Sequence, residues 1–206
     1  MDKSVIDAFW RQRSAEGKGR WTDDALLRYE IGWLSPYASA QARILDLGSG
    51  PGELSSRLVA PGGSLTLVEK YPDFLKQAPT GDNIRHVCCD VLEFEDSSTY
   101  DMILLFGVVT HLGEEEERLV YRKAAEHLAA GGRLVVKNQV TLAEEKLVSG
   151  YSASLRQEYC GRYPGLDQQL ARLKVIFSFV EVVNYPAQFN PWPDTRHVAF
   201  VCAQEP

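Results

Sequence analysis

The chain has few cysteines and histidines, and they are not arranged as metal ligands. Among its 206 residues there are four of each: the cysteines stand at 88, 89, 160 and 202, and the histidines at 86, 111, 127 and 197. No two cysteines form a CxxC pair, and the histidines lack the short spacing of a zinc site. We therefore expect neither disulfides nor a bound metal.

An excess of positive charge and long apolar runs are also missing. The chain has 22 basic and 28 acidic side chains, a formal net charge of −6. This balance argues against a broad surface for nucleic acid, whose phosphates must be neutralised by many lysines and arginines. The first ten residues, MDKSVIDAFW, carry charges where a signal peptide or membrane span is continuously apolar. We expect a cytoplasmic protein without a membrane or nucleic-acid partner.

Short apolar runs rich in β-branched residues alternate with stretches of helical pattern along the chain. Strands are predicted at 42–47, 64–69, 84–89, 100–106, 133–140, 175–184 and 197–202. Helices are predicted at 53–60, 71–77, 114–129, 142–160 and 166–174, the third ending at Gly131-Gly132. This alternation is typical of an α/β fold with parallel strands joined by crossover helices, and the length suits one domain.

About 40 residues precede the first strand and carry two amphipathic helical patterns. One contains Phe9 and Trp10, and the other begins at Thr22-Asp23-Asp24. Gly17-Lys18-Gly19 links them. We expect 1–40 to form a helical cap or lid, 41–140 the binding core, and 141–206 the last strands with elements that contact a substrate.

The strongest local motif is ILDLGSGPGEL, residues 44–54, in which a buried strand runs into a glycine-rich turn and a helix start. Gly48, Gly50 and Gly52 remove side chains that would keep the backbone away from a ligand. The spacing is G-x-G-x-G, so the G-x-G-x-x-G turn of dinucleotide-binding proteins fits less well.

Two acids end the next two predicted strands. Glu69 closes SLTLVE, where a carboxylate can accept hydrogen bonds from both hydroxyls of a ribose, and Asp90 closes HVCCD, where it can accept an adenine amino group. With a single acid at a strand end, NAD would remain an equally suitable candidate ligand. Two acids at successive strand ends favour an adenosine held along its edge.

From residue 42 to about 140, and with less similarity to the end, the sequence resembles the class I S-adenosylmethionine-dependent methyltransferases. ILDLGSGPG is similar to the glycine-rich first motif of that family, LVEK to its ribose-binding acid, and CCDV to its adenine-binding acid. YDMILLFGVVTHL and LAAGGRLVV are similar to its motifs at the fourth and fifth strands. The resemblance implies a Rossmann-like three-layer sandwich whose seven-stranded, mostly parallel sheet has an antiparallel last strand.

The resemblance also implies cofactor contacts for S-adenosylmethionine and its product S-adenosylhomocysteine. Asp46 would order the glycine-rich turn. Apart from the resemblance, Arg13 or Lys18 could reach the carboxylate of the cofactor when the N-terminal segment closes over the site. The other implied contacts are Gly48, Ser49, Gly50, Gly52, Glu69, Lys70, Tyr71, Asp90, Val91, Phe106 and Gly107. Thr110 departs from the pattern, because many relatives have another histidine or a small residue before the position of His111.

His111 is the candidate general base because it follows the fourth strand at the carboxyl edge of the sheet, where ligands of such sheets bind. Methyl transfer is an in-line displacement, so the main requirement is correct positioning, and a base matters when the acceptor must lose a proton. The alternative is a histidine that packs against the cofactor or caps the next helix. His197 is a second candidate, whereas His86 and His127 are interpreted as structural.

The acceptor is expected to contact segments that are not common to the fold. Aromatic and polar residues there suit a polar or anionic ring, although the tyrosines could equally pack a covering helix. The candidates are Tyr151, Tyr159, Arg162, Asn190 and Trp192. We therefore expect a methyltransferase for a small molecule, with an oxygen of a glycan or secondary metabolite favoured. N- or C-methylation, S-adenosylmethionine binding without methylation, and an NAD-dependent oxidoreductase are the alternatives.

Overall fold

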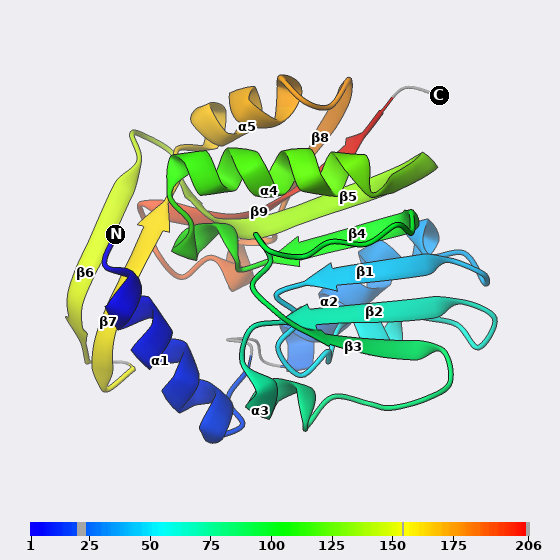
Figure 1. Ribbon diagram of the computed structural model, residues 1–206. Helices are drawn as coiled ribbons and strands as arrows, with labels where there is room; N and C mark the ends of the chain where they lie inside the picture. The colour runs from blue at the N-terminus through cyan, green and yellow to red at the C-terminus, as the bar shows by residue number, and fades with distance from the viewer. Residues whose placement is uncertain (20–23, 154, 205–206) are drawn as a thin grey trace.

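The computed structural model describes residues 1–19, 24–153 and 155–204, and its centre is a seven-stranded sheet (Figure 1). The strands are β1 (Arg43–Leu47), β2 (Ser64–Glu69), β3 (Ile84–Cys88), β4 (Tyr100–Phe106), β5 (Leu128–Thr141), β8 (Phe179–Asn184) and β9 (Thr195–Ala203). Their order is β3-β2-β1-β4-β5-β9-β8, and β9 runs antiparallel to both of its neighbours. The predicted α/β class, strand number and antiparallel last strand are confirmed.

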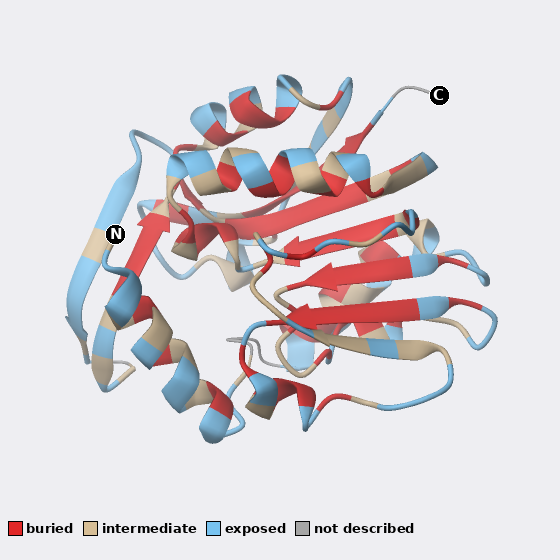
Figure 2. Cartoon of the chain, viewed as in Figure 1, coloured by how far each residue is buried: buried red, intermediate tan, exposed pale blue. Residues whose placement is uncertain are grey.

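Helices cover both faces of this sheet. The α-helices of the described residues are α1 (Lys3–Ala15), α2 (Asp24–Leu34), α3 (Pro72–Leu75), α4 (Glu114–Glu126) and α5 (Leu166–Lys174), of which α1 lies at one end of the sheet. Alternate residues of β1 enter two cores: Leu45 and Leu47 pack with Tyr121 of α4, and Ile44 packs with Leu34 of α2. This period of two is what a strand buried on both faces requires. In Figure 2 the central strands are accordingly buried along most of their length.

The predicted helix at 142–160 is wrong. The segment instead forms most of a hairpin of β6 (Lys146–Ser152) and β7 (Gln157–Tyr163), which pair antiparallel to each other outside the main sheet. The sequence KLVSGYS is poor in strong helix formers, and Gly150 has φ +131°, outside the helical range. The hairpin buries Cys160 and leaves β6 largely exposed, so tertiary contact on one side holds it in place (Figure 2).

Several predicted boundaries also shift. The helix at 53–60 is reduced to a 3₁₀ turn at Ser55–Arg57, and the one at 71–77 is the short α3. Helix α4 ends at Glu126, so Gly131-Gly132 do not terminate it but lie inside β5, next to an irregular pairing between Tyr100 and Met102. A Cβ on Gly132 would lie 2.9 Å from the carbonyl oxygen of Tyr100, which explains a glycine there.

The two N-terminal helices occupy different places. Helix α2 joins the layer beneath the sheet, whereas α1 crosses the open end of the molecule, beside β7 and α3 (Figure 1). The predicted helix start at Thr22-Asp23 falls outside the described residues, and α2 is described from Asp24. Among the described residues, no helix is both long and apolar enough to cross a membrane.

Candidate functional site at the carboxyl edge of the sheet

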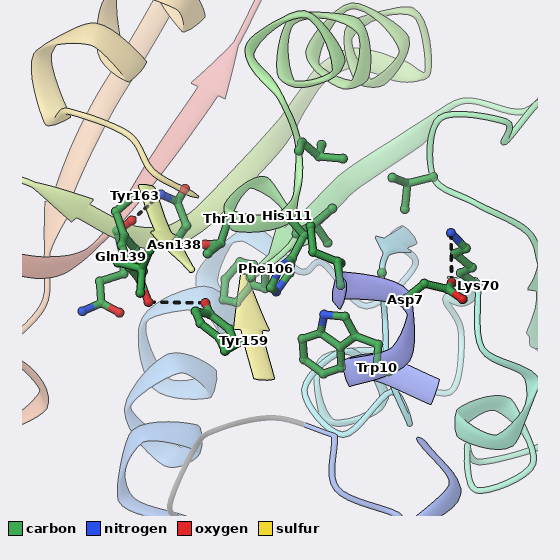
Figure 3. A pocket seen from close by; sticks show the side chains of 18 of the residues that line it. Asp7, Trp10, Lys70, Phe106, Thr110, His111, Asn138, Gln139, Tyr159 and Tyr163 are labelled. Atoms are coloured by element: carbon green, nitrogen blue, oxygen red, sulfur yellow. Dashed lines mark hydrogen bonds and ion pairs between the residues drawn. The ribbon is translucent and has the colours of Figure 1, made fainter. Parts of the chain in front are cut away.

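A cavity of about 1020 Å³ opens at the carboxyl ends of the strands. Its floor is formed by the residues that follow β1, β2, β3 and β4, and by the end of β5. Helix α1 and the β6–β7 hairpin form its walls (Figure 3). This edge is where open α/β sheets bind ligands, because the strand ends leave a crevice there.

The glycine-rich turn after β1 has a backbone that other residues would strain. Gly48, Gly50 and Gly52 have φ of +73°, +55° and +72°. A Cβ on Gly48 would lie 2.3 Å from Cγ2 of Val108. Gly48 and Gly50 line the cavity. Gly52 does not line it, and a glycine is needed there because the Leu67 side chain leaves no room for a Cβ. The backbone at this turn can therefore approach a ligand closely.

Asp46 supports the turn from behind. Its Oδ2 accepts a hydrogen bond of 2.6 Å from the Ser55 hydroxyl, and the residue is buried and does not line the cavity. Ser49, which does line it, is fixed by a backbone hydrogen bond of 3.1 Å to the Val68 carbonyl oxygen. Asp46 is thus placed to order the turn, as the resemblance implies.

Glu69 holds two segments of the cavity together. Its Oε2 accepts a hydrogen bond of 2.8 Å from the Gly50 amide, and its Oε1 accepts one of 2.9 Å from the Tyr71 amide. Burial raises the pKa of this carboxyl, and the two amides oppose that shift. Each carboxylate oxygen can accept a further hydrogen bond. Glu69 can therefore receive two adjacent hydroxyls while it shapes the turn.

Lys70 connects Asp90 to helix α1. Its Nζ lies 3.4 Å from Oδ2 of Asp90 and 3.5 Å from Oδ1 of Asp7. The Tyr71 hydroxyl donates to Asp7 over 3.2 Å, and burial raises the pKa of that phenol. Asp7 lines the cavity and was not predicted from the sequence. Its position one turn before Trp10 on the same helix face was the available signal.

The adenine side of the predicted site follows β3 and its methionine side follows β4, with β2 and β1 between these two strands. Oδ1 of Asp90 accepts a hydrogen bond of 3.0 Å from the Leu92 amide, which holds the loop after β3, and Val91 lines the cavity beside it. Phe106 and Gly107 line it at the end of β4, and Gly107 has φ +74°. The arrangement orders the predicted contacts along the sheet from β3 to β4.

His111 lies in the wall of the cavity, between an aromatic ring of α1 and one of β7. Its ring centroid is 5.4 Å from that of Trp10 and 6.1 Å from that of Tyr159, both edge-on (Figure 3). Burial lowers its pKa to about 4, opposed by a hydrogen bond to the Cys160 backbone. Its buried Nδ1 has no hydrogen-bond partner among the described residues. His111 is thus neutral near pH 7, with Nδ1 able to accept a proton or a hydrogen bond.

Three of the five predicted acceptor residues line the cavity: Tyr151, Tyr159 and Trp192. The hydroxyls of Tyr159 and Tyr163 lie 3.3 Å apart, and burial raises the pKa of Tyr159. These aromatic rings come from the hairpin and from the loop before β9, so segments peripheral to the sheet wall the part of the cavity where the acceptor is predicted to bind.

The structure places Arg162 and Asn190 outside the cavity lining. Arg162 is buried and forms an ion pair with Glu117, and its Nε donates to the Leu112 carbonyl oxygen over 2.8 Å. Asn190 closes a turn by donating to the Tyr185 carbonyl oxygen over 3.0 Å. Both side chains are engaged by the protein itself, which a spacing in the sequence could not reveal.

Arg13 is also outside the cavity lining. Its guanidinium lies over the rings of Phe9 and Trp10, at 5.7 and 5.8 Å from their centroids, and donates to the Gly19 carbonyl oxygen over 3.4 Å. The sequence-based prediction that it reaches a cofactor carboxylate is therefore not supported by this arrangement.

Polar residues at the end of β5 were missed from the sequence. Lys137, Asn138 and Gln139 line the cavity, and the Gln139 amide donates to the Thr195 hydroxyl over 2.5 Å. The signal was a polar KNQ stretch that interrupts the apolar LVV of a central strand. Among the described residues, no cluster of three or more histidine, cysteine or acidic side chains could hold a metal ion.

Comparison with known proteins agrees with this geometry. Residues 44–132 match a family model described as a methyltransferase domain. N-terminal Xaa-Pro-Lys N-methyltransferase 1 of Ailuropoda melanoleuca is 28% identical over 121 residues, which are 55% of this chain and 53% of that protein. The chain thus spans about half the length of the curated relatives it matches.

Solved structures resemble the fold along the whole chain. A 1,6-didemethyltoxoflavin-N1-methyltransferase of Burkholderia thailandensis has a TM-score of 0.77 at 19% identity, over 100% of this chain and 92% of that one. An N-methyltransferase of Bradyrhizobium japonicum WM9 has a TM-score of 0.65 at 20% identity, over 98% and 99%. Both structures contain S-adenosylhomocysteine.

Proposed function

We propose that this chain binds S-adenosylmethionine and methylates a small molecule, as the match of residues 44–132 to a methyltransferase-domain model and the class I fold support. The observation that carries the proposal is the position of Glu69. Its carboxylate is buried between the Gly50 and Tyr71 amides and faces the cavity, where it can accept both hydroxyls of a ribose.

The residues present fit this cofactor. An adenosine would lie between Glu69 and the loop that starts at Asp90, and the methionine part would lie against Gly48 and Phe106. When bound, S-adenosylmethionine supplies a methyl group on a positively charged sulfur. The chain's own contribution is to hold the acceptor in line with that group and to exclude water, which α1 and the β6–β7 hairpin do by walling the cavity.

The size of the cavity favours a small acceptor. Its volume of about 1020 Å³ must hold the cofactor together with the acceptor, and small-molecule sites generally have volumes of roughly 300–1,000 Å³. The curated relatives are named for methylating protein N-termini, and a peptide is therefore the second candidate.

His111 decides which acceptor atoms are suitable. Its pKa of about 4 and its buried Nδ1 make it a weak proton acceptor. An aliphatic alcohol needs a stronger base. We therefore narrow the proposed oxygen acceptor to a hydroxyl that ionises readily, and a ring or amine nitrogen is the alternative, as the names of both structural relatives suggest.

The proposal is tested by calorimetry with S-adenosylmethionine and S-adenosylhomocysteine. The Glu69→Gln variant should bind both about 10- to 100-fold more weakly, because a charge-assisted hydrogen bond to the ribose is worth roughly 1.5–3 kcal/mol. Glu181→Gln, on the exposed side of β8, is the control and should bind like the wild type. Equal affinity of wild type and Glu69→Gln would reject the ribose assignment.

Methyl transfer itself needs a second measurement. Mass spectrometry of reactions with phenolic, heteroaromatic and amine acceptors should show one product heavier by a methyl group together with S-adenosylhomocysteine. Tight cofactor binding without such a product would favour a binding protein that does not methylate.

A further inference from the structure

Two tyrosine hydroxyls of the β6–β7 hairpin meet in the cavity. Tyr159 and Tyr163 both line it, and their hydroxyl oxygens lie 3.3 Å apart (Figure 3). One hydroxyl donates to the other, so this contact uses one of the two O–H protons. The described residues offer neither hydroxyl another hydrogen-bond partner. The pair therefore has one O–H donor left for a ligand.

We propose that the Tyr159–Tyr163 hydroxyl pair determines specificity by donating a hydrogen bond to an uncharged ring carbonyl oxygen or ring nitrogen of the methyl acceptor. This inference rests on the proposed methyltransferase function and narrows its substrate class to rings that contain such an atom. Three features support it: the geometry of β7, the protonation of the hydroxyls, and the charges that line the cavity.

Gly161 gives the Tyr159 ring its position. Residues 159, 161 and 163 share one face of β7, because successive side chains of a strand point to opposite faces. A Cβ on Gly161 would lie 2.4 Å from Oη and 2.8 Å from Cζ of Tyr159, so the ring fills the space of a side chain at 161 and points along the strand toward Tyr163. Gly161 does not have a positive φ, so its backbone does not require a glycine. The missing side chain instead makes room for the ring.

Two further rings hold Tyr159 in this orientation. Its ring centroid lies 5.3 Å from that of Phe9 on α1 and 6.1 Å from that of His111, both edge-on. His111 belongs to the turn that follows β4, and Phe106, a predicted contact of the methionine side, ends that strand. The hydroxyl pair is thus fixed on a wall of the cavity that adjoins the end of β4, where a methyl acceptor would have to bind.

The hydroxyl pair acts as a donor at neutral pH. Burial raises the pKa of Tyr159, so its hydroxyl stays protonated. Hydrogen bonds in series polarise one another, so the hydroxyl that accepts within the pair becomes a stronger donor to a third group. A ligand that covers the pair must accept this proton, because a buried donor without a partner costs free energy.

The charges of the cavity favour an uncharged ligand atom. Among the described residues, the basic side chains that line it, histidines aside, are those of Lys3, Lys70, Lys137 and Lys146. Each of these lysines is in an ion pair, Lys137 with the buried Glu30 and Lys146 with Asp194. A carboxylate would have to compete with an acid of the protein for its cation. A carbonyl oxygen or a ring nitrogen accepts a hydroxyl proton without needing a positive charge.

Other rings of the cavity suit a flat molecule. Phe106 lines it at the end of β4, and Trp192 lines it from the loop before β9. Aromatic rings recognise flat ligands by their faces, while a few polar groups fix the orientation. The hydroxyl pair supplies a polar contact of this kind.

The experiment uses the full chain saturated with S-adenosylhomocysteine and measures the binding of matched probes by calorimetry. Hydroxyquinolines are compared with naphthols of the same shape, which have a carbon in place of the ring nitrogen, and hydroxyindanones with indanols, which lack the carbonyl. The ratio of the two affinities within a pair is the preference. A wild type that binds no hydroxyquinoline and no hydroxyindanone at millimolar concentration would overturn the proposed substrate class.

The variant that tests the pair is the double substitution Tyr159→Phe with Tyr163→Phe, which keeps both rings and removes both hydroxyls. Its preference should fall by about threefold to tenfold, the scale of one hydrogen bond between uncharged groups. Its affinity for S-adenosylhomocysteine should change less than threefold, and its circular dichroism spectrum checks that it is folded. Tyr37→Phe removes a tyrosine hydroxyl outside the cavity lining and should keep the wild-type preference. An unchanged preference of the double variant for every pair of probes would overturn the proposal.

Gly161→Ala tests the geometry without removing a hydroxyl. Its methyl group would displace the Tyr159 ring and separate the two hydroxyls, so the preference should fall as far as in the double variant. A folded Gly161→Ala protein with the full preference would refute the geometric argument and the proposal with it. A quinoline carboxylate that binds the wild type tenfold more tightly than the matching hydroxyquinoline would also overturn it, because the ligand atom would then be an anion. If the wild type does not bind S-adenosylhomocysteine, the proposed function fails first, before any probe is measured.

Discussion

Oδ1 of Asp7, on helix α1, lies 3.5 Å from Nζ of Lys70, the residue that directly follows the buried Glu69. The Tyr71 hydroxyl donates to the same Asp7 oxygen over 3.2 Å. Lys70 also reaches Asp90, so one lysine joins the N-terminal helix to both acids of the predicted adenosine site. The position of α1 and the shape of the cofactor half of the cavity are therefore coupled.

Asp7→Asn tests this coupling. The amide keeps the size of the side chain and removes its charge, so α1 should be held less firmly and S-adenosylhomocysteine should bind roughly threefold more weakly, the scale of a partly exposed ion pair. Calorimetry measures the change. Asp73→Asn, which removes the exposed partner of Lys76, should leave affinity unchanged. An Asp7→Asn protein that matches the wild type would show that α1 docks without this contact.

His111 should make stability depend on pH. Burial lowers its pKa in the folded protein to about 4, below the ordinary 6.5, so the unfolded chain takes up this proton first as the pH falls. The contribution of the neutral His111 to the free energy of unfolding is complete above pH 6.5. It is lost progressively between pH 6.5 and 4, by about 3 kcal/mol in total.

Urea unfolding at pH 7 and pH 4.5 measures this dependence. His111→Phe keeps a ring between Trp10 and Tyr159 and cannot take up a proton, so it should lose less stability between the two pH values than the wild type. His86→Gln retains His111 and should show the wild-type loss. Identical pH dependence in His111→Phe and wild type would contradict the burial argument.

Gly48→Ala should disturb the glycine-rich turn. The new Cβ would lie 2.3 Å from Cγ2 of Val108 on a backbone with φ +73°, so we expect a loss of about 1–3 kcal/mol in the free energy of unfolding together with weaker cofactor binding. Gly32→Ala is the control, because nothing lies within 4 Å of its Cβ position in α2. It should stabilise the protein by roughly 0.5–1 kcal/mol. Chemical denaturation of both variants decides between these outcomes.

Arg162→Met should lower the free energy of unfolding and should not selectively raise the KM for the acceptor. Arg162 is buried and pairs with the fully buried Glu117, which also pairs with Arg172 over 3.2 Å, so the substitution removes one of two charge-assisted contacts and should cost roughly 1.5–3 kcal/mol. Arg118→Met removes an exposed partner of Glu114 and should have no measurable effect on stability. A stable Arg162→Met protein whose acceptor KM alone has risen would restore Arg162 to the acceptor site.

The sequence by itself determined the sheet and the position of the predicted cofactor contacts at its carboxyl edge. Apolar runs that are buried on both faces define central strands such as β1 and β4, and a ligand-binding turn needs glycines at fixed positions such as Gly48 and Gly50. Glu69 is the last residue of β2 and Asp90 lies two residues after β3, so their place at the edge of the sheet is set by local sequence. These features depend on short-range rules that a single sequence records.

The tertiary structure alone decided the part of the cavity where the acceptor is predicted to bind. Strands β6 and β7 form a hairpin because β7 packs against α1 and the turn that contains His111, and this packing outweighs a weak local preference. Arg162 turns inward because Glu117, 45 residues away in the chain, offers a buried charge. Lys137 and Glu30 likewise meet only after α2 packs on the sheet. Such long-range pairings depend on packing and charge compensation, which no local pattern encodes.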